Sequence, residues 1–149
     1  MPLPSNILVP TDFSPTADRA LDYAIALGAK LGARIHLVHV IGIPALGVPE
    51  LGLAMASATI DALLANGQVE LDRIVDEHRN QVSFGEAILR NGDARDEVLQ
   101  VANELHADLI VIGTHGRRGV ARALLGSVAE AIVRLAPCPV LTVGPKVVT

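Results

Sequence analysis

Three glycines and a serine near the carboxyl end of the chain have the residue types and the spacing of an anion-binding loop. Gly113 is followed after two residues by Gly116, and nine residues later come Gly126 and Ser127. In a glycine-rich loop between a strand and a helix, backbone N–H groups can converge on an anion, most often a phosphate. A side chain would block close approach of the ligand or the left-handed backbone of a turn. The pattern therefore predicts phosphate binding.

The sequence on either side supplies the strand and the helix that such a loop needs. Asp108–Ile112 is an apolar run typical of a buried strand, and Val128–Leu135 has apolar residues at helical spacing. The amino end of such a helix favours anions. The glycine spacing matches neither the dinucleotide-binding nor the Walker pattern, which excludes those two classes of site.

A second group of polar residues follows the first predicted strand, Asn6–Pro10, and consists of Thr11 and Asp12. In open parallel sheets, ligands bind beyond the carboxyl ends of the strands, where the strand order reverses. If the first and fourth strands are neighbours at this reversal, Pro10, Thr11 and Asp12 meet the glycine loop. We expect the two loops to form one site.

Strands and helices alternate along the rest of the chain. Ser14 and Pro15 suit a helix N-cap and first helical position, and Gly32 suits a helix end. The predicted strands are Asn6–Pro10, Arg34–Ile41, Ser83–Leu89, Leu109–Ile112 and Val140–Val143. The predicted helices begin near Ser14, Thr59, Asp93 and Ser127, and residues 42–58 are expected to form an irregular connection. This order predicts an α/β fold, a doubly wound parallel five-stranded sheet with helices on both faces, in one domain over residues 1–149.

Composition and charge narrow the class of protein further. The chain is 50% apolar but only 2% aromatic, so its core must be built from aliphatic side chains. A net charge of −4 argues against a nucleic-acid surface or a polybasic membrane patch. Prolines and Glu50 interrupt the most apolar stretch, residues 40–60, which excludes a membrane span there. A single cysteine, Cys138, excludes an internal disulfide. We expect a cytoplasmic protein that binds neither nucleic acid nor membrane.

With these motifs in place, the sequence resembles the universal stress protein family, in its nucleotide-binding branch. The resemblance rests on the full pattern G-x-x-G, nine residues, then G-[ST], and on four further stretches. These are Ile7–Asp12, His39-Val40, Ala107–Gly116 and Pro137–Val143. It therefore extends over nearly the whole chain and implies binding of ATP, with or without magnesium.

The resemblance also implies a role for each site residue. Asp12 would hydrogen-bond the ribose with Thr11 beside it, and the backbone of Val40 would meet the adenine edge. Gly113 and Gly116 would let the main chain pass close to ribose and phosphates. The phosphates would be held by Gly126, Ser127, Val128 and Ala129. A homodimer through the last strand, Val140–Val143, is implied as well, and an apolar edge strand is usually paired or covered.

Several residues have an alternative role that needs no ligand. Ser127 and Glu130 have the spacing of a capping box, in which Ser127 satisfies its own helix. Asp12 could help to cap the first helix. Arg117 is a candidate to neutralise phosphate, although loop arginines are more often simply solvated. His36 and His39 are three residues apart on a strand and face opposite sides, which argues against a shared metal.

The sequence does not assemble a recognisable set of catalytic residues. We expect nucleotide binding with at most slow ATP hydrolysis, and the alternative is a nucleotide-free dimerisation module of the same fold. A phospho-receiver domain would need an acidic cluster after the first strand, where Asp12 stands alone, and a phospho-acceptor Asp after the third. An ATP-pyrophosphatase would need a serine- and glycine-rich loop in place of Pro10-Thr11-Asp12.

Overall fold

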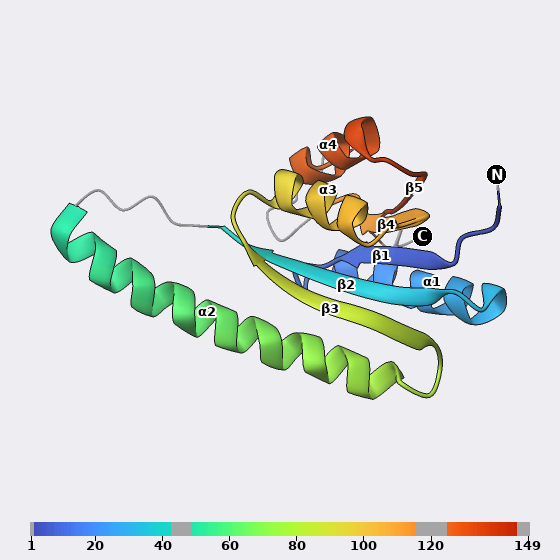
Figure 1. Cartoon of the computed structure of the whole chain (residues 1–149), viewed down its shortest axis with the longest axis horizontal. Coiled ribbons are helices and arrows are strands. Elements are labelled where there is room, and N and C mark those ends of the chain that lie inside the picture. Colours follow the sequence, from blue (N-terminus) through green and yellow to red (C-terminus); the bar gives the residue numbers. More distant parts are fainter. Residues whose placement is uncertain (1, 43–48, 116–124, 146–149) are drawn as a thin grey trace.

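The fold is a five-stranded sheet with every neighbouring pair of strands parallel and the order β3-β2-β1-β4-β5 (Figure 1). In this computed structural model, residues 2–42, 49–115 and 125–145 are described, with backbone alone for residues 49–57. The strands are β1 (Asn6–Pro10), β2 (Arg34–Ile41), β3 (Ser83–Asn91), β4 (Leu109–Gly113) and β5 (Val140–Val143). The helices are α1 (Pro15–Leu31), α2 (Pro49–His78), α3 (Ala94–Glu104) and α4 (Ser127–Leu135). The predicted α/β class and the adjacency of the first and fourth strands are confirmed.

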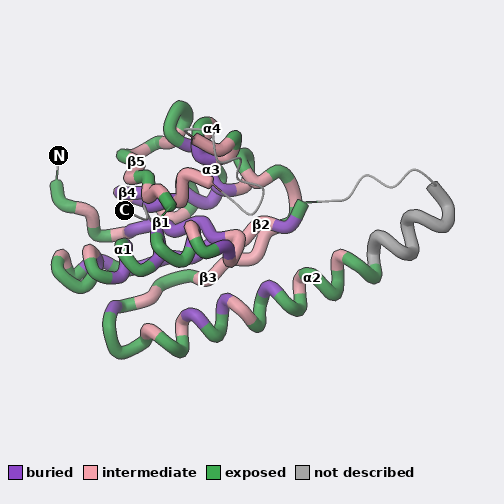
Figure 2. The backbone as a smooth tube through the Cα atoms, turned by 180° about the vertical axis from the view of Figure 1, so that it is seen from behind, coloured by how far each residue is buried: buried purple, intermediate pink, exposed green. Residues whose placement is uncertain are grey.

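Helices cover both faces of the sheet, and each face has its own aliphatic core. On one face, α1 and the second half of α2 pack on residues such as Ile7, Ile35 and Val111. On the other face, α3 and α4 pack on residues such as Leu8 and Ile110. The buried residues are concentrated in β1, β2 and β4 (Figure 2). A sheet buried on both faces accounts for the nearly continuous apolar runs of these strands.

Helix α1 begins and ends where its sequence signals predict. The Ser14 side chain accepts a hydrogen bond from the Ala17 N–H, and Pro15 occupies the first helical position. Gly32 ends the helix in the left-handed conformation, at φ 68°, which glycine adopts without a steric penalty. The cap at Ser14 fixes the direction in which the chain leaves β1, and so it fixes the loop that carries Asp12.

Helix α2 is longer than the sequence pattern predicts. It begins at Pro49, so the irregular connection expected over residues 42–58 is wrong for residues 49–58, while residues 43–48 lie outside the described part. Alanine, leucine and methionine are strong helix formers, and a proline is tolerated in the first turn. The buried residues of its described side chains lie in the second half, at Gly67, Leu71 and Ile74, and the first half extends beyond the sheet (Figure 1).

A local irregularity in β3 is explained by a buried histidine. The pairing of β2 with β3 shifts register between Ile35 and Leu37. A Cβ on Gly85 would lie 2.2 Å from the His36 ring, so only glycine fits beside that ring. The Glu86 N–H donates to His36 Nδ1 over 2.9 Å, and Nε2 of the same ring bonds the Asn6 side chain. His36 thus ties β2 to both of its neighbouring strands.

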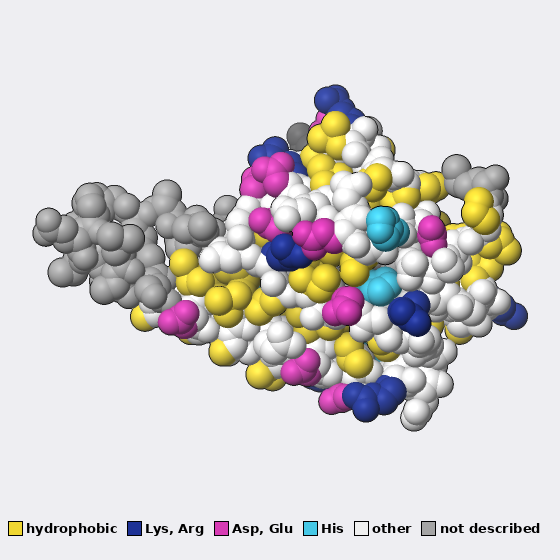
Figure 3. Space-filling model, viewed as in Figure 1, with side chains coloured by type: hydrophobic (Ala, Val, Ile, Leu, Met, Phe, Trp, Pro, Cys, Tyr) yellow, Lys and Arg dark blue, Asp and Glu magenta, His cyan; other side chains and the backbone are white. Residues whose placement is uncertain are grey.

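The surface of the molecule is mixed in charge. On the face seen in Figure 3, basic side chains lie beside acidic ones. Arg90 of β3, for example, pairs with Glu97 and Glu104 of α3. Among the described residues, none of the helices combines the length and apolar character needed to cross a bilayer.

Candidate functional site

A cavity of about 1040 Å³ opens beyond the carboxyl ends of β1, β2 and β4. It lies where the strand order reverses, as expected for an open parallel sheet. The predicted site residues that line it are Pro10, Thr11, Asp12, Val40, Gly113, Gly126, Ser127, Val128 and Ala129. Gly116 and Arg117 lie outside the described residues. The loop after β1 and the described ends of the glycine loop therefore meet at one cavity.

The loop between β1 and α1 is held by hydrogen bonds from its own side chains. Thr11 Oγ1 accepts from the Phe13 N–H over 3.0 Å, and Asp12 Oδ1 accepts from the Ser14 N–H over 2.9 Å. The Thr11 N–H donates to the Val38 carbonyl of β2. Phe13 has a φ of 63°, a left-handed conformation that is unfavourable for an aromatic residue. The loop is thus fixed in a specific, strained shape.

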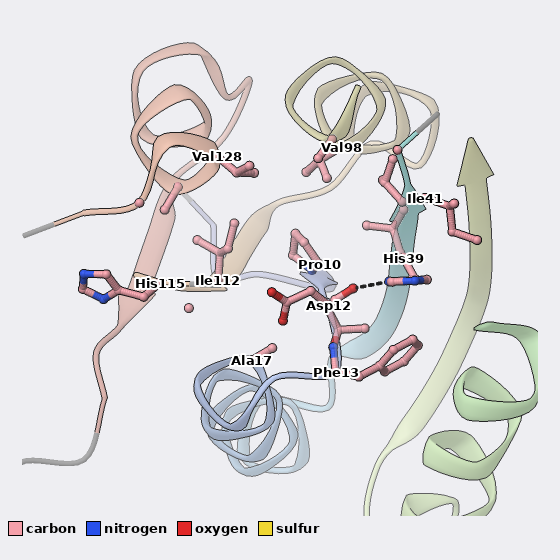
Figure 4. A pocket seen from close by; sticks show the side chains of 18 of the residues that line it. Pro10, Asp12, Phe13, Ala17, His39, Ile41, Val98, Ile112, His115 and Val128 are labelled. Carbon is pink, nitrogen blue, oxygen red and sulfur yellow. Dashed lines mark hydrogen bonds between the residues drawn. The ribbon is translucent and has the colours of Figure 1, made fainter. Parts of the chain in front are cut away.

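This shape shows how Asp12 takes part in the start of α1. The residue that caps α1 is Ser14, and Asp12 bonds the backbone of that cap rather than the helix itself. The Asp12 carboxylate points into the cavity, toward the side formed by Ile112 and His115 (Figure 4). A carboxylate has about four acceptor positions, so one that accepts the Ser14 N–H can also accept hydrogen bonds from hydroxyl groups of a ligand.

The predicted capping box at Ser127 is wrong. The N-cap of α4 is Gly126, with φ −68° and ψ 159°, and no side-chain hydrogen bond caps this helix. The chain enters the helix one residue early because the Gly126 N–H is fixed to the Thr114 carbonyl and its own carbonyl accepts from Glu130. Ser127 is therefore the first helical residue and cannot act as the cap.

The start of α4 consequently presents a row of backbone donors to the cavity. Ser127, Val128 and Ala129 occupy the first three helical positions, where no acceptor exists within the helix. All three residues line the cavity, together with Gly126 and Leu125. Convergent amides with the positive end of the helix dipole behind them form a site for an anion.

The glycines of the loop have a structural reason that the sequence pattern did not reveal. A Cβ on Gly113 would lie 3.0 to 3.2 Å from Thr16 of α1, and one on Gly126 would lie 2.9 Å from the Thr114 carbonyl oxygen. Neither residue has a left-handed φ. Close approach of one chain segment to another therefore requires these two glycines, whether or not a ligand is bound.

The charges around the cavity differ from one side to the other. Desolvation and the neighbouring Asp22 raise the pKa of Asp18, with smaller contributions of the same sign from Asp12 and Glu70. Arg73 acts in the opposite direction. The side of the cavity near α1 and α2 carries the carboxylates of Asp12 and Glu70, whereas the start of α4 carries backbone donors. An anionic group is repelled from the first side and attracted to the second.

Several lining residues were not identified from the sequence. They are Phe13, His39, Thr114, His115, Leu125 and, from α2, Leu63, Asn66, Gly67 and Glu70. His39 stands beside Val40 in the motif, and its position there was the available signal. The α2 residues carried no signal, because only tertiary packing brings them to the cavity. Within the described residues, no cluster of three or more metal-ligating side chains is found.

Comparison with known proteins places the whole of this architecture in one family. The model of the universal stress protein family matches residues 4–144. A universal stress protein of Methanocaldococcus jannaschii is 32% identical over 142 residues, which cover 93% of this chain and 81% of that protein.

Solved structures agree with the family match. Universal stress protein UspA from Lactobacillus plantarum has a TM-score of 0.84 at 24% identity, over 93% of this chain and 97% of that one, which is a likeness of fold. A universal stress protein solved in complex with cAMP has a TM-score of 0.64 at 25% identity, over 96% of this chain and 98% of that one.

Proposed function

The chain belongs to the universal stress protein family, and from this premise we propose that it binds adenine nucleotides, chiefly ATP, as a signal in the stress response. The observation that carries the proposal is the row of amides at Ser127, Val128 and Ala129, which lines the same cavity as Asp12. The solved relative in complex with cAMP supports an adenine nucleotide as the class of ligand.

The charge difference across the cavity supports one orientation of the nucleotide. The phosphates lie at the start of α4, where the first-turn amides have no acceptor within the helix and the helix dipole favours an anion. The nucleoside lies on the side of β1 and β2, where Asp12 accepts from the ribose hydroxyls and the backbone of Val40 meets the adenine edge. The carboxylates of Asp12 and Glu70, which line the cavity, disfavour the reverse orientation, because it would bring the phosphates toward them.

Two further residues belong to the proposal on the resemblance alone. Gly116 lets the main chain pass close to the ribose and phosphates, and Arg117 neutralises phosphate charge. Magnesium can accompany the triphosphate as part of the ligand. The proposed role is binding with at most slow hydrolysis, in the cytoplasm, and the response is transmitted by a homodimer.

Isothermal titration of the purified protein with ATP and GTP in the presence of magnesium tests the proposed ligand. We expect saturable binding of ATP and weaker binding of GTP, because the backbone of Val40 can complement the adenine edge. Nucleotide extracted from the purified protein should likewise be adenine nucleotide. Absence of ATP binding at saturating ligand would favour the alternative, a nucleotide-free dimerisation module.

The free edge of β5 supports the homodimer. The carbonyl groups of Pro139 and Val143 accept hydrogen bonds from Ile110 and Thr114 on the β4 side. Because backbone groups alternate in direction along a strand, those of Val140 and Thr142 point away from β4. An apolar edge that pairs with no further strand in the described part of the chain is suited to pairing with the same strand of a second copy.

Replacement of Thr142 by proline tests this pairing. Thr142 is exposed, and its N–H points away from β4, so Thr142→Pro removes an edge donor while leaving the β4–β5 ladder in place. We expect a dimer for the wild type and a monomer for the variant in analytical ultracentrifugation. Thr142→Ser keeps the N–H and should remain dimeric. A variant that is as dimeric as the wild type would contradict the β5 interface.

A further inference from the structure

His39 joins β2 to the loop that carries Asp12. Its Nδ1 lies 2.7 Å from the carbonyl oxygen of Thr11, the bond drawn as a dashed line in Figure 4. A carbonyl oxygen can only accept, so Nδ1 carries the proton and donates. The bond reaches the residue immediately before Asp12, at the point where the chain leaves β1.

The position of the His39 ring is fixed from two sides. The Phe13 ring lies against it, with centroids 4.4 Å apart and planes inclined at 40°. On the α2 side the helix approaches so closely that a Cβ on Gly67 would lie 3.2 Å from His39 Cδ2. A ring confined between Phe13 and α2 has little freedom to turn, so its donor stays directed at the Thr11 carbonyl.

The loop that His39 contacts needs support from outside itself. Phe13 holds a left-handed φ of 63°, which costs free energy for a residue other than glycine. The hydrogen bonds that Thr11 Oγ1 and Asp12 Oδ1 accept lie within the loop and turn with it. The His39 hydrogen bond and its contact with the Phe13 ring instead tie Thr11 and Phe13, the two residues that flank Asp12, to the sheet, beside the bond from the Thr11 N–H to the Val38 carbonyl.

We propose that His39 is a positioning residue, which sets the direction of the Asp12 carboxylate and thereby determines recognition of the ribose. This inference rests on the proposed binding of adenine nucleotides. His39 itself makes no contact with the ribose in this account, and it acts through the Thr11 carbonyl. Its loss should therefore weaken the part of the affinity that depends on the ribose hydroxyl groups and spare the part that depends on the phosphates.

Two ligands and three variants test the proposal by isothermal titration. The ligands are ATP and 2′,3′-dideoxy-ATP, which lacks the hydroxyl groups that Asp12 would bind. His39→Phe keeps an aromatic ring beside Phe13 but removes the donor. His39→Asn places an amide N–H near the position of Nδ1, and His39→Gln places one farther out. Thermal unfolding of each variant establishes that it is folded.

We expect the wild type to prefer ATP over the dideoxy analogue by about tenfold, the value of a charge-assisted hydrogen bond. His39→Phe should bind ATP about fivefold to tenfold more weakly and leave affinity for the dideoxy analogue within about twofold. His39→Gln should behave like His39→Phe, and this second variant serves if the phenylalanine disturbs folding. His39→Asn should restore the preference for ATP.

The possible outcomes separate the inference from the function on which it rests. Undiminished preference for ATP in both His39→Phe and His39→Gln would overturn the positioning role and leave nucleotide binding intact. Equal weakening in all three variants, including His39→Asn, would also overturn it, because the donor would then not be the cause. Failure of the wild type to bind either ligand would overturn the proposed function and the inference together.

Discussion

The two loops that meet at the cavity are built in opposite ways. After β1, the side chains of Thr11 and Asp12 are engaged with the backbone of their own loop, and the Thr11 carbonyl accepts from His39. At the start of α4, the amides of the first helical turn have no acceptor within the helix and no side-chain cap. The polar groups on the first side have partners within their own loop, whereas the first-turn amides of α4 have none within their own helix.

This difference shows which side selects by shape and which by charge. A loop whose polar groups are already paired presents a fixed surface, suited to recognising a nucleoside of one geometry. A helix start whose first amides lack an acceptor within the helix instead gains most from an anion, because a ligand can supply such acceptors. In the proposed complex, the nucleoside therefore binds a preformed side of the cavity, and the phosphates complete the other side.

The largest expected effect comes from removing one backbone donor at the start of α4. Ser127→Pro deletes the first amide of α4, and proline is well tolerated at the first helical position. The preceding Gly126 has the extended ψ of 159° that a following proline requires. We expect the fold to persist and ATP affinity to fall by about 10- to 100-fold, the value of a hydrogen bond to a charged group.

Ser127→Ala is the matched control for this variant. It removes the hydroxyl and keeps the amide, so ATP affinity should fall by about fivefold or less in the same titration. If the alanine and proline variants bound ATP equally, the backbone donor would not be responsible, and the contrast between the two loops would lose its basis.

A second variant tests Gly126, the residue at the N-cap of α4. Gly126→Ala would bring a Cβ to 2.9 Å from the Thr114 carbonyl oxygen, a backbone atom that cannot easily move. We expect a loss of about 1–3 kcal/mol in the free energy of unfolding, measured with urea. In Gly28→Ala, the contacts at 3.0 Å are to side-chain ends of Ile35 and Val82, and alanine is the better helix former.

Gly28→Ala should therefore cost clearly less stability than Gly126→Ala. The reverse order would mean that the close approach of Gly126 to Thr114 is not what demands a glycine there.

The smallest expected effect concerns His36 of β2, whose ring is hydrogen-bonded to both neighbouring strands. Burial and the nearby Arg34 lower the pKa of His36 below its ordinary value of 6.5, and Glu86 opposes them. The neutral ring accepts from the Glu86 N–H through Nδ1. Below the ordinary pKa, His36 binds a proton more readily in the unfolded chain than in the folded one. The contribution of the neutral ring to the free energy of unfolding is therefore complete at neutral pH and falls as the pH decreases.

Urea unfolding at about pH 7.5 and about pH 5.5 measures this dependence. His36→Gln keeps a polar side chain without a titrating group and should lose less stability on acidification than the wild type. An equal loss in both proteins would assign the acid sensitivity to other groups.

Much of the fold followed from local signals in the sequence. The bounds of β1, β2 and β5, the cap at Ser14 and the end at Gly32 depend on short patterns whose physical cause is local. The beginning of α2 did not follow, because its alanine- and leucine-rich first half lacks the one-sided pattern of a helix packed on a core. The sequence identified which loops form the site because their glycines and acidic residue are unusual in type.

The sequence could not show which of several possible hydrogen-bond partners each polar group takes in the folded chain. Ser127 and Glu130 have the spacing of a capping box, but the bond between the Gly126 amide and the Thr114 carbonyl moves the cap back by one residue. The spacing of His36 and His39 argues against a shared metal and indicates no other role for His39. Its hydrogen bond to the Thr11 carbonyl joins residues that are 28 positions apart in the sequence. Such contacts arise only once the sheet has brought the strands together.

The central claim is that the start of α4 binds phosphate while the β1–α1 loop and β2 bind the nucleoside. Amide chemical shifts of ¹⁵N-labelled protein, recorded with ATP and separately with adenosine, test it most directly. ATP should shift the resonances of Ser127, Val128 and Ala129, and adenosine should leave these unchanged, whereas both ligands should shift Asp12 and Val40. If ATP left the α4 amides unmoved, or if adenosine moved them equally, the account would be contradicted.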